Sequence, residues 1–491
     1  MAIRQIDQAI LAGASVTGVP PDLLRVAACL FLSFPLCGIL KRLPSKQPTL
    51  KELYILACAV FYLLGIFSYT SGTLHLLADA MFTYVFVRTK RYWSFMPVVT
   101  FLVLLAHMLY THYHEQILFD ESFSGHYGHS GAQMVLMIKL TSFAWDAFDG
   151  THKDESTLSD FQKENRVIQM PPLLRYLSWA FFFPAVLTGP ACGYREYSQW
   201  LDMTLFNDYF AMQDKKHGKT VKRRIPRSGH VALVKALEGS LWAYIFMQSG
   251  NYISGDMLFE SRYRSLSFSW RVLFLWALSF SYRMRYYAAW CISEAACIHS
   301  GLGFNYTTEE GRIRWDRVRN VRPLNIETAQ NIHGIISNWN MNTSKWLRYY
   351  VFLRVTPKGK KPGSLSTLIT FIVSSLWHGI LPGYYLMFVL GALMQMFGKI
   401  YRRYLRPVVL GTSYKRAYDV LTWVCTQAAL GYAVQPFVVL ELYRSLKVWA
   451  SVYFYVHVFL LASWFLFLGP GRRMLVPYLR TLHEELASQA D

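Results

Sequence analysis

Long apolar runs alternate with short polar stretches along the whole chain. Two of them, 53–70 and 452–468, carry no Asp, Glu, Lys or Arg. A run of about 18–20 apolar residues spans the hydrocarbon core of a bilayer as a helix whose backbone hydrogen bonds are all internal. The pattern therefore predicts an all-α integral membrane protein. The apolar segments lie near residues 23–40, 53–70, 73–87, 95–111, 132–145, 174–190, 231–247, 270–282, 286–303, 365–378, 383–399, 418–440 and 450–468.

Several of these segments are shorter than a straight span requires. Short or Gly/Pro-broken segments can be re-entrant or tilted where they line a cavity, so we expect about ten to twelve crossings. Basic residues gather between the segments, as the positive-inside rule predicts. The basic clusters that follow 23–40 and 73–87 place both of these loops on the cytosolic side, with a lumenal N-terminus.

The densest basic cluster is 215–227 (KKHGKTVKRRIPR), and it constrains the path of the chain. If every earlier segment crossed the bilayer, this cluster would lie in the lumen, against the positive-inside rule. We therefore predict that 174–190 is re-entrant and that 215–227 is a solvated cytosolic loop. Attraction of phosphate or CoA is a second interpretation of the same charges.

Composition agrees with a membrane protein and excludes other classes. Of 491 residues, 53% are hydrophobic and 16% are charged, and the formal net charge is +20. In a soluble protein such a charge would suggest nucleic acid, but here the basic loops between spans account for it. The seven cysteines include no CxxC pair, which excludes a disulfide framework or a zinc ribbon.

The stretch 305–364 is too polar to span a bilayer and too apolar for a free loop. It mixes charged and aromatic residues, which favours amphipathic helices at the cytosolic interface. It leads into the apolar helices predicted within 365–399. We predict that these parts belong to one membrane domain that extends over residues 1–491.

His378 is the strongest candidate for chemistry. It ends an uncharged run, about 20 Å along the predicted helix at about 1.5 Å per residue, and the helix-breaking sequence GILPG follows at 379–383. An ionisable side chain at such depth is costly and marks a functional site. Desolvation favours the uncharged imidazole, which can accept a proton. The alternative interpretation is a structural histidine, whose ring nitrogens have hydrogen-bond partners and which takes no part in chemistry.

Other polar residues near apolar segments are weaker candidates. Asn340, in SNWNMNTSKWLRYY (337–350), could orient groups in a low-dielectric site or could cap a helix. Lys139 and Asp146 are two helical turns apart, so they could pair on one face. Glu294 lies among small residues, which predicts close helix packing around a buried carboxylate. Four histidines could bind a metal, but a lumenal loop needs none: His112, His114, His126 and His129.

Several stretches resemble the membrane-bound O-acyltransferase family, in a fungal-type version of its lysophospholipid acyltransferase branch. GxxxxGK[ST], GxSxG, HExxH and the HxxxxD motif of the other large glycerolipid acyltransferase class are missing. Tyr306 stands where many relatives continue with Gly, and the C-terminus ELASQAD carries no dilysine signal. The matching stretches occur in the family's order: KLTSFAWDAFDG (139–150), a passage ending in TGP (171–190), AAWCISEAACIHSGLGFN (288–305), SNWNMNTSKWLRYY (337–350) and SSLWHGILPGYY (374–385).

The resemblance implies about eleven transmembrane helices, with re-entrant and interfacial helices, around a central tunnel. Acyl-CoA would enter from the cytosolic side and the lysolipid through a lateral opening. The family's catalytic His corresponds to His378 and its Asn to Asn340. The Asp and Glu that this branch requires correspond to Asp146 and Glu294. Residence in the endoplasmic reticulum membrane also follows from the family.

The expected reaction is acyl transfer from acyl-CoA to the free hydroxyl of a lysophospholipid. The expected acceptors are lysophosphatidic acid, lysophosphatidylcholine, lysophosphatidylethanolamine and lysophosphatidylserine. Position alone suggests that Lys345, Trp346, Arg348 and Arg354 bind acyl-CoA. Acyl-CoA is a co-substrate, and no cofactor, metal, nucleic acid or obligatory protein partner is expected. The alternatives are a sterol, diacylglycerol or protein acceptor within the family, or a transporter or channel outside it.

Overall fold

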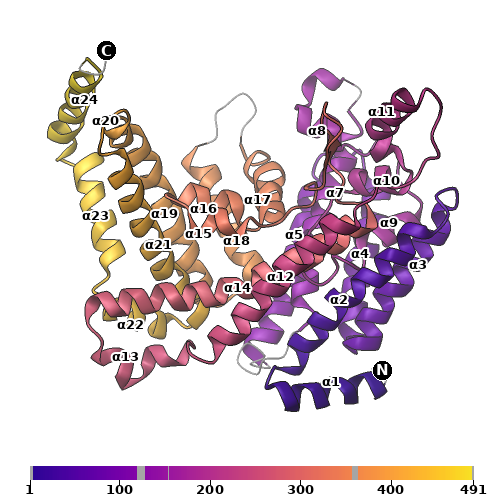
Figure 1. Cartoon of the computed structure of the whole chain (residues 1–491), viewed down its shortest axis with the longest axis horizontal. Helices are drawn as coiled ribbons and strands as arrows, with labels where there is room; N and C mark the ends of the chain where they lie inside the picture. Colours follow the sequence, from indigo (N-terminus) through magenta and orange to yellow (C-terminus); the bar gives the residue numbers. More distant parts are fainter. Residues whose placement is uncertain (1–3, 119–127, 153, 357–362, 489–491) are drawn as a thin grey trace. The chain divides into compact units, whose positions relative to one another are not determined.

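The structure of the protein is a computed structural model. It describes residues 4–118, 128–152, 154–356 and 363–488 (Figure 1). These residues are mostly helical and divide into two compact units. Unit 1 comprises 1–242, 287–321 and 342–366, and unit 2 comprises 243–286, 322–341 and 367–491. That the two units act as the single membrane domain expected from the sequence remains a prediction.

Unit 1 contains the N-terminal helices and a small hairpin. The hairpin pairs Tyr306 with Arg314 and Thr307 with Ile313, so the all-α prediction is correct apart from these strands. The elements are α1 (Arg4–Thr17), α2 (Pro21–Arg42), α3 (Pro48–Val60) with a π-helical stretch (Phe61–Ile66), α4 (Thr70–Lys90), α5 (Met96–Tyr113) with His114–Leu118, α7 (Ser130–Asp149), Glu155–Thr157, α8 (Asp160–Asn165), α9 (Leu173–Ala180), α10 (Tyr194–Leu201), Thr204–Phe206, α11 (Asn207–His217), β1 (Tyr306–Thr307), β2 (Ile313–Arg314), α17 (Met341–Trp346) and Leu347–Phe352.

Unit 2 contains the C-terminal helices. Two long helices contribute residues to both units: α12 (Gly229–Gly250) and α14 (Phe268–Ser300). The remaining elements are Asp256–Phe259, α13 (Ser261–Ser265), α15 (Pro323–Glu327), α16 (Ile332–Asn338), α18 (Ser364–His378), α19 (Pro382–Tyr404), α20 (Arg406–Val409), α21 (Lys415–Val439), α22 (Leu442–Ser451), α23 (Tyr455–Phe467) and α24 (Arg472–Ser488).

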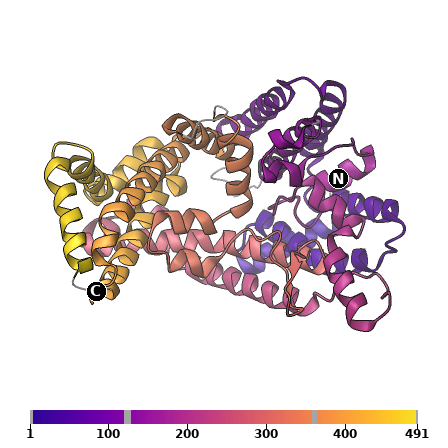
Figure 2. The ribbon, with the colours of Figure 1, turned by 90° about the horizontal axis from the view of Figure 1, so that it is seen from above.

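The core of unit 2 lies where α19 packs along α21 (Figures 1 and 2). Buried apolar side chains from α14, α19, α21, α22 and α23 meet there, and Tyr432 stacks on Trp449 with ring centroids 5.3 Å apart. The outward faces remain apolar: on α23 Val458, Leu461 and Trp464 are all more than half exposed. Such a continuous apolar surface is typical of a protein that contacts lipid.

Four described helices are long and apolar enough to cross a membrane, and the bent pair α22 and α23 would make a fifth. The multi-pass prediction is therefore supported in its coarse form, whereas about eleven spans are not confirmed. Other long helices carry buried charge, such as Asp79 in α4 and Lys139 in α7, which lowers their apolar content. The four helices are Pro21–Arg42, Pro48–Ile66, Met96–Leu118 and Pro382–Tyr404.

The segments predicted at 270–282 and 286–303 form a single helix, α14, of 33 residues. The apolar pattern breaks at Arg283 and Arg285, but the helix does not. Arg283 donates to both carboxylate oxygens of Glu327, at 2.9 and 2.7 Å, and Arg285 lies against two tyrosine rings. Because both charges have partners, they can be accommodated within a helix. Two separate segments were therefore a wrong prediction.

The segment 174–190 is not a continuous helix. α9 has eight residues and ends at Ala180, so it is about 12 Å long and too short to cross a bilayer. Lys139 donates to the carbonyls of Trp179 and Ala180 at this end, where a helix leaves acceptors unpaired and favours a cation. The predicted pairing of Lys139 with Asp146 is therefore wrong. The re-entrant path remains a prediction.

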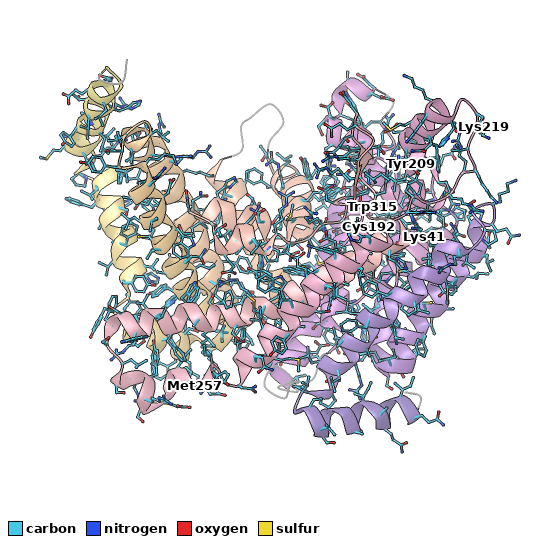
Figure 3. The ribbon with its side chains drawn as sticks, in the orientation of Figure 1. Lys41, Cys192, Tyr209, Lys219, Met257 and Trp315 are labelled. Atoms are coloured by element: carbon cyan, nitrogen blue, oxygen red, sulfur yellow. The ribbon has the colours of Figure 1, made fainter. Side chains whose placement is uncertain are left out.

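One end of unit 1 brings several helix ends together. Lys41, in the last turn of α2, donates to the carbonyl of Pro226 at 2.7 Å and to the hydroxyl of Ser228 at 2.9 Å (Figure 3). Ser228 in turn donates to the carbonyl of His299 at 3.4 Å. The start of α12 and the end of α14 therefore lie at the same face as the basic segment 215–227.

Candidate functional site

His378 is the last residue of α18, and its half-buried ring lies among aromatic side chains. The imidazole stacks on Phe388 with ring centroids 5.1 Å apart and meets Phe437 edge-on at 5.2 Å. Tyr384 and Trp377 lie at 6.0 and 4.7 Å. The ring therefore packs against aromatic side chains of unit 2.

The turn after His378 is formed by residues that end one helix and begin the next. Gly379 has a φ of 147°, a conformation that is accessible almost only to glycine. Pro382 begins α19, where its missing N–H needs no partner. At Gly383 an added Cβ would lie 2.1 Å from the carbonyl oxygen of Pro436. The GILPG sequence thus allows α19 to pack directly on the end of α21.

Asn340 lies between α16 and α17 with a φ of 44°, in the left-handed region. Asn is one of the few residues besides Gly that adopts this conformation readily. Its neighbours are held by their own contacts: Asn338 donates to the carbonyl of Gly334 at 2.8 Å, and the Trp339 ring meets Tyr286 edge-on at 5.5 Å. The sequence motif therefore forms a fixed turn with Asn340 at its left-handed position.

Both predicted catalytic residues belong to unit 2. α16, which ends at Asn338, packs against α19, which begins at Pro382. The elements next to Asn340 and His378 are therefore in contact. Direct interaction between the two side chains remains a prediction.

In unit 1, the segment 345–354 is docked on α7. Its contact residues are spaced four apart, which places them on one helical face. Asp146 is 2% exposed, so its buried carboxylate depends on a hydrogen-bond donor from this segment. A role of Asp146 in the reaction remains a prediction. Three pairs form the contact, with distances of 3.0, 2.8 and 2.9 Å: Trp346 to Thr141, Tyr350 to Asp146 and Arg354 to Asp149.

A second pair of motifs is joined in the same unit. Ser293 of α14 donates to the carbonyls of Pro184, at 2.6 Å, and Gly189. Trp290, one turn earlier, donates to the carbonyl of Thr188 at 3.2 Å. The TGP passage is thus fixed to the 288–305 stretch. These contacts were missed from the sequence because they join residues more than a hundred positions apart.

Glu294 is fully buried between α12, α14 and the loop that follows β2. Its Oε1 accepts a hydrogen bond from Nε of Arg319 at 3.3 Å, and its Oε2 lies 3.7 Å from Nζ of Lys235. Gly239 of α12 packs so closely on Ile292 that an added Cβ would lie 2.6 Å from its side chain. The predicted buried carboxylate at a close helix contact is confirmed.

The four residues suggested for acyl-CoA binding differ in their exposure and in their contacts. Arg348 and Lys345 are both exposed, and Nζ of Lys345 lies 3.7 Å from the carboxylate of Glu196. Trp346 is 2% exposed, and Arg354 forms an ion pair with Asp149. Lys345 and Arg348 can therefore reach a soluble ligand, whereas Trp346 and Arg354 already hold the docked segment. Binding of CoA remains a prediction for all four.

The histidines considered for a metal do not form a described cluster. His126 lies outside the described residues, and His129 pairs with Glu115 at 3.1 Å and stacks on His75. In the part of the chain that the structure describes, no group of three or more His, Cys, Asp or Glu side chains is arranged to hold a metal ion.

Comparison with known proteins gives consistent matches over most of the chain. A family model described as MBOAT, membrane-bound O-acyltransferase family, matches residues 116–435, which include all the predicted catalytic and supporting residues. The "Lysophospholipid acyltransferase" of Saccharomyces cerevisiae is 42% identical, covering 94% of this chain and 77% of that protein. The protein of the same name in Schizosaccharomyces pombe is 38% identical, with coverages of 95% and 90%. "Lysophospholipid acyltransferase 1" of Arabidopsis thaliana is 29% identical, with coverages of 91% and 94%.

Proposed function

We propose a reaction for this chain from one premise, which the comparisons show: the chain belongs to the membrane-bound O-acyltransferase family. It is an O-acyltransferase, and its acceptor is a lysophospholipid. The donor is acyl-CoA, and the acceptors include lysophosphatidic acid and the choline, ethanolamine and serine lysolipids. The site of action is the endoplasmic reticulum membrane.

In the proposed mechanism, His378 accepts the proton of the lysolipid hydroxyl as the new C–O bond forms at the thioester carbonyl carbon. Negative charge develops on the carbonyl oxygen, and the amide N–H of Asn340 donates a hydrogen bond to it. Collapse of this intermediate breaks the C–S bond. The imidazolium of His378 then returns its proton to the departing CoA thiolate, so the enzyme ends unchanged.

General base catalysis by His378 contributes about 10²–10⁴-fold to the rate. Much of the remaining rate acceleration comes from holding the two lipid substrates end to end, because this replaces a bimolecular encounter by an oriented reaction. Asp146 acts indirectly, because its carboxylate accepts the hydrogen bond of Tyr350 and so holds the docked segment. Glu294 has one carboxylate oxygen engaged by Arg319. Arg348 and Lys345 are proposed to attract the phosphates of CoA. The reaction needs no cofactor.

The observation that carries this proposal is the placement of His378 among aromatic rings at the end of α18. Purified protein in lipid nanodiscs should be given labelled acyl-CoA and a panel of acceptors. We expect acylated lysophospholipids, with no product from a sterol, diacylglycerol or a peptide. Product from a sterol or a peptide alone would contradict the proposed acceptor, and no transfer to any acceptor would contradict the reaction.

A further inference from the structure

A cavity of about 410 Å³ opens in unit 1 where α12 begins and α14 ends. Its walls come from α12, α14 and residues 313–319, including Trp315 (Figure 3). Small-molecule sites have volumes of about 300–1,000 Å³. The cavity is therefore large enough for a ligand, and it lies at the end of the unit that also carries Lys41 and the basic segment 215–227.

A buried oxygen in this cavity lacks a donor. Glu294 is 0% exposed, and its Oε2 accepts no hydrogen bond from any residue that the structure describes. Lys235 forms an ion pair with it, but its Nζ lies 3.7 Å away, beyond hydrogen-bond distance, and donates to Glu238 at 2.9 Å. Buried polar atoms without a partner are uncommon in folded proteins. This oxygen can therefore accept a hydrogen bond from an N–H or O–H group of a ligand.

The cavity is lined by as many acidic as basic side chains. Glu238, Glu294 and Asp316 face Lys235, Arg314 and Arg319. Within the described ranges no carboxylate lies at ion-pair distance from Arg314, and this side chain is exposed. A balanced lining is unfavourable for a polyanion such as CoA and suits a zwitterion, whose anionic part an arginine can bind.

We propose that this cavity binds the head group of an aminophospholipid, with its primary ammonium on Oε2 of Glu294 and its phosphate on Arg314. A trimethylammonium group has no N–H and cannot satisfy Oε2, so choline head groups should bind less tightly. The same chemistry belongs to a lysolipid acceptor and to a diacyl lipid of the bilayer. The inference rests on the proposed function only where it takes this lipid to be the acceptor.

The direct test is binding of soluble head groups to the full-length protein in phosphatidylcholine nanodiscs, followed by thermal unfolding. Glycerophosphoethanolamine should raise the unfolding temperature at concentrations at least about tenfold lower than glycerophosphocholine, since the latter lacks the N–H donors. Equal effects of the two probes, or no effect of either, would overturn the proposal.

Two variants and a matched control assign the contacts. Glu294→Gln should remove the preference between the two probes, and Arg314→Gln should weaken binding of both. Arg312→Gln is the control, because Arg312 is 82% exposed, is paired with Glu310 and does not line the cavity. If Glu294→Gln does not fold, the comparison of Arg314→Gln with Arg312→Gln decides alone, and equal affinities in these two would reject the site.

Kinetics separates the two lipid sources. If the acceptor occupies the cavity, Arg314→Gln should raise KM for lysophosphatidylethanolamine with little change in kcat. If a bilayer lipid occupies it, the same variant should instead abolish the effect of added diacylphosphatidylethanolamine on the rate. His378→Ala should bind the head group like the unmodified protein. Head-group binding without any acyl transfer by the unmodified protein would refute the proposed function and leave this site intact.

Discussion

At the residue scale, Asn340 combines a left-handed backbone with a side-chain amide, and two substitutions separate these properties. Asn340→Gly keeps the backbone conformation, so it should unfold at the same temperature while kcat falls about 10²–10³-fold with loss of the donor. Asn340→Ala should in addition lose about 1–2 kcal/mol of stability. Turnover and thermal unfolding in nanodiscs measure both effects. A fully active Asn340→Gly would mean that only the turn matters.

The hydrogen bond from Tyr350 to Asp146 is the second test at this scale. Tyr350→Phe leaves a buried carboxylate without its donor, so stability should fall by about 1–3 kcal/mol. Asp146→Asn combined with Tyr350→Phe should cost less than the sum of the single changes, because both remove the same contact. Tyr349→Phe is the control, since the ring of Tyr349 keeps its stacking on Phe161. Strict additivity would argue against the contact between Asp146 and Tyr350.

The sequence led to the individual residues more readily than to their partners. His378 is recognisable because an ionisable side chain within an apolar segment is energetically costly and usually has a function. The partner of Asp146 was predicted from helical spacing within one segment, and this was wrong because Lys139 binds the carbonyls that end α9 instead. Contacts between segments distant in sequence have no local signal. The four-residue spacing of 346, 350 and 354 indicates a shared helical face but does not identify the helix that this face contacts.

At the element scale, the junction of α19 and α21 controls the surroundings of His378. Gly383→Ala would place a Cβ 2.1 Å from the carbonyl oxygen of Pro436, so α19 must shift. We expect a loss of at least about 1–3 kcal/mol, the usual cost of overpacking, together with reduced kcat. Gly391→Ala, on the same helix, meets open space and should be neutral or stabilising. Thermal unfolding of the two variants should differ; equal unfolding temperatures would contradict this packing.

Helix boundaries show where hydropathy fails. Arg283 and Arg285 divide an apolar run in the sequence, yet α14 continues through them because Glu327 and aromatic rings receive the charges. α9 ends at Ala180 within an apolar run, although no charged residue interrupts the sequence there. Apolar content thus predicted that helices exist, whereas their lengths depend on tertiary partners that no single segment reveals.

At the scale of the whole molecule, the continuity of α14 changes the expected path of the chain. If α12 and α14 each cross the bilayer once, residues 305–321 return to the side of 215–227. The cytosolic location of the Asn motif remains a prediction. The hydrogen bonds that join Lys41, Ser228 and the carbonyl of His299 place these ends at one face. Two separate crossings at 270–282 and 286–303 would have put the motif on the opposite side.

Thiol labelling in sealed microsomes tests this path. Lys219→Cys should react with an impermeant reagent added outside, and Tyr252→Cys should react only after the membrane is opened, because α12 lies between them. Both substitutions are made in a protein that carries Cys425→Ser, which removes the exposed native cysteine. The other six native cysteines are buried. Labelling of both positions from outside would contradict a crossing by α12.

The most direct test of the central claim is the turnover of His378→Ala beside His457→Ala. His457 also lies in unit 2 and bonds to Tyr432 at 2.7 Å, but it is not part of the proposed site. With both proteins folded in nanodiscs, we predict that His378→Ala lowers kcat about 10²–10⁴-fold, while His457→Ala turns over like the unmodified enzyme. A folded His378→Ala with unmodified kcat would contradict the assignment of His378 as the base.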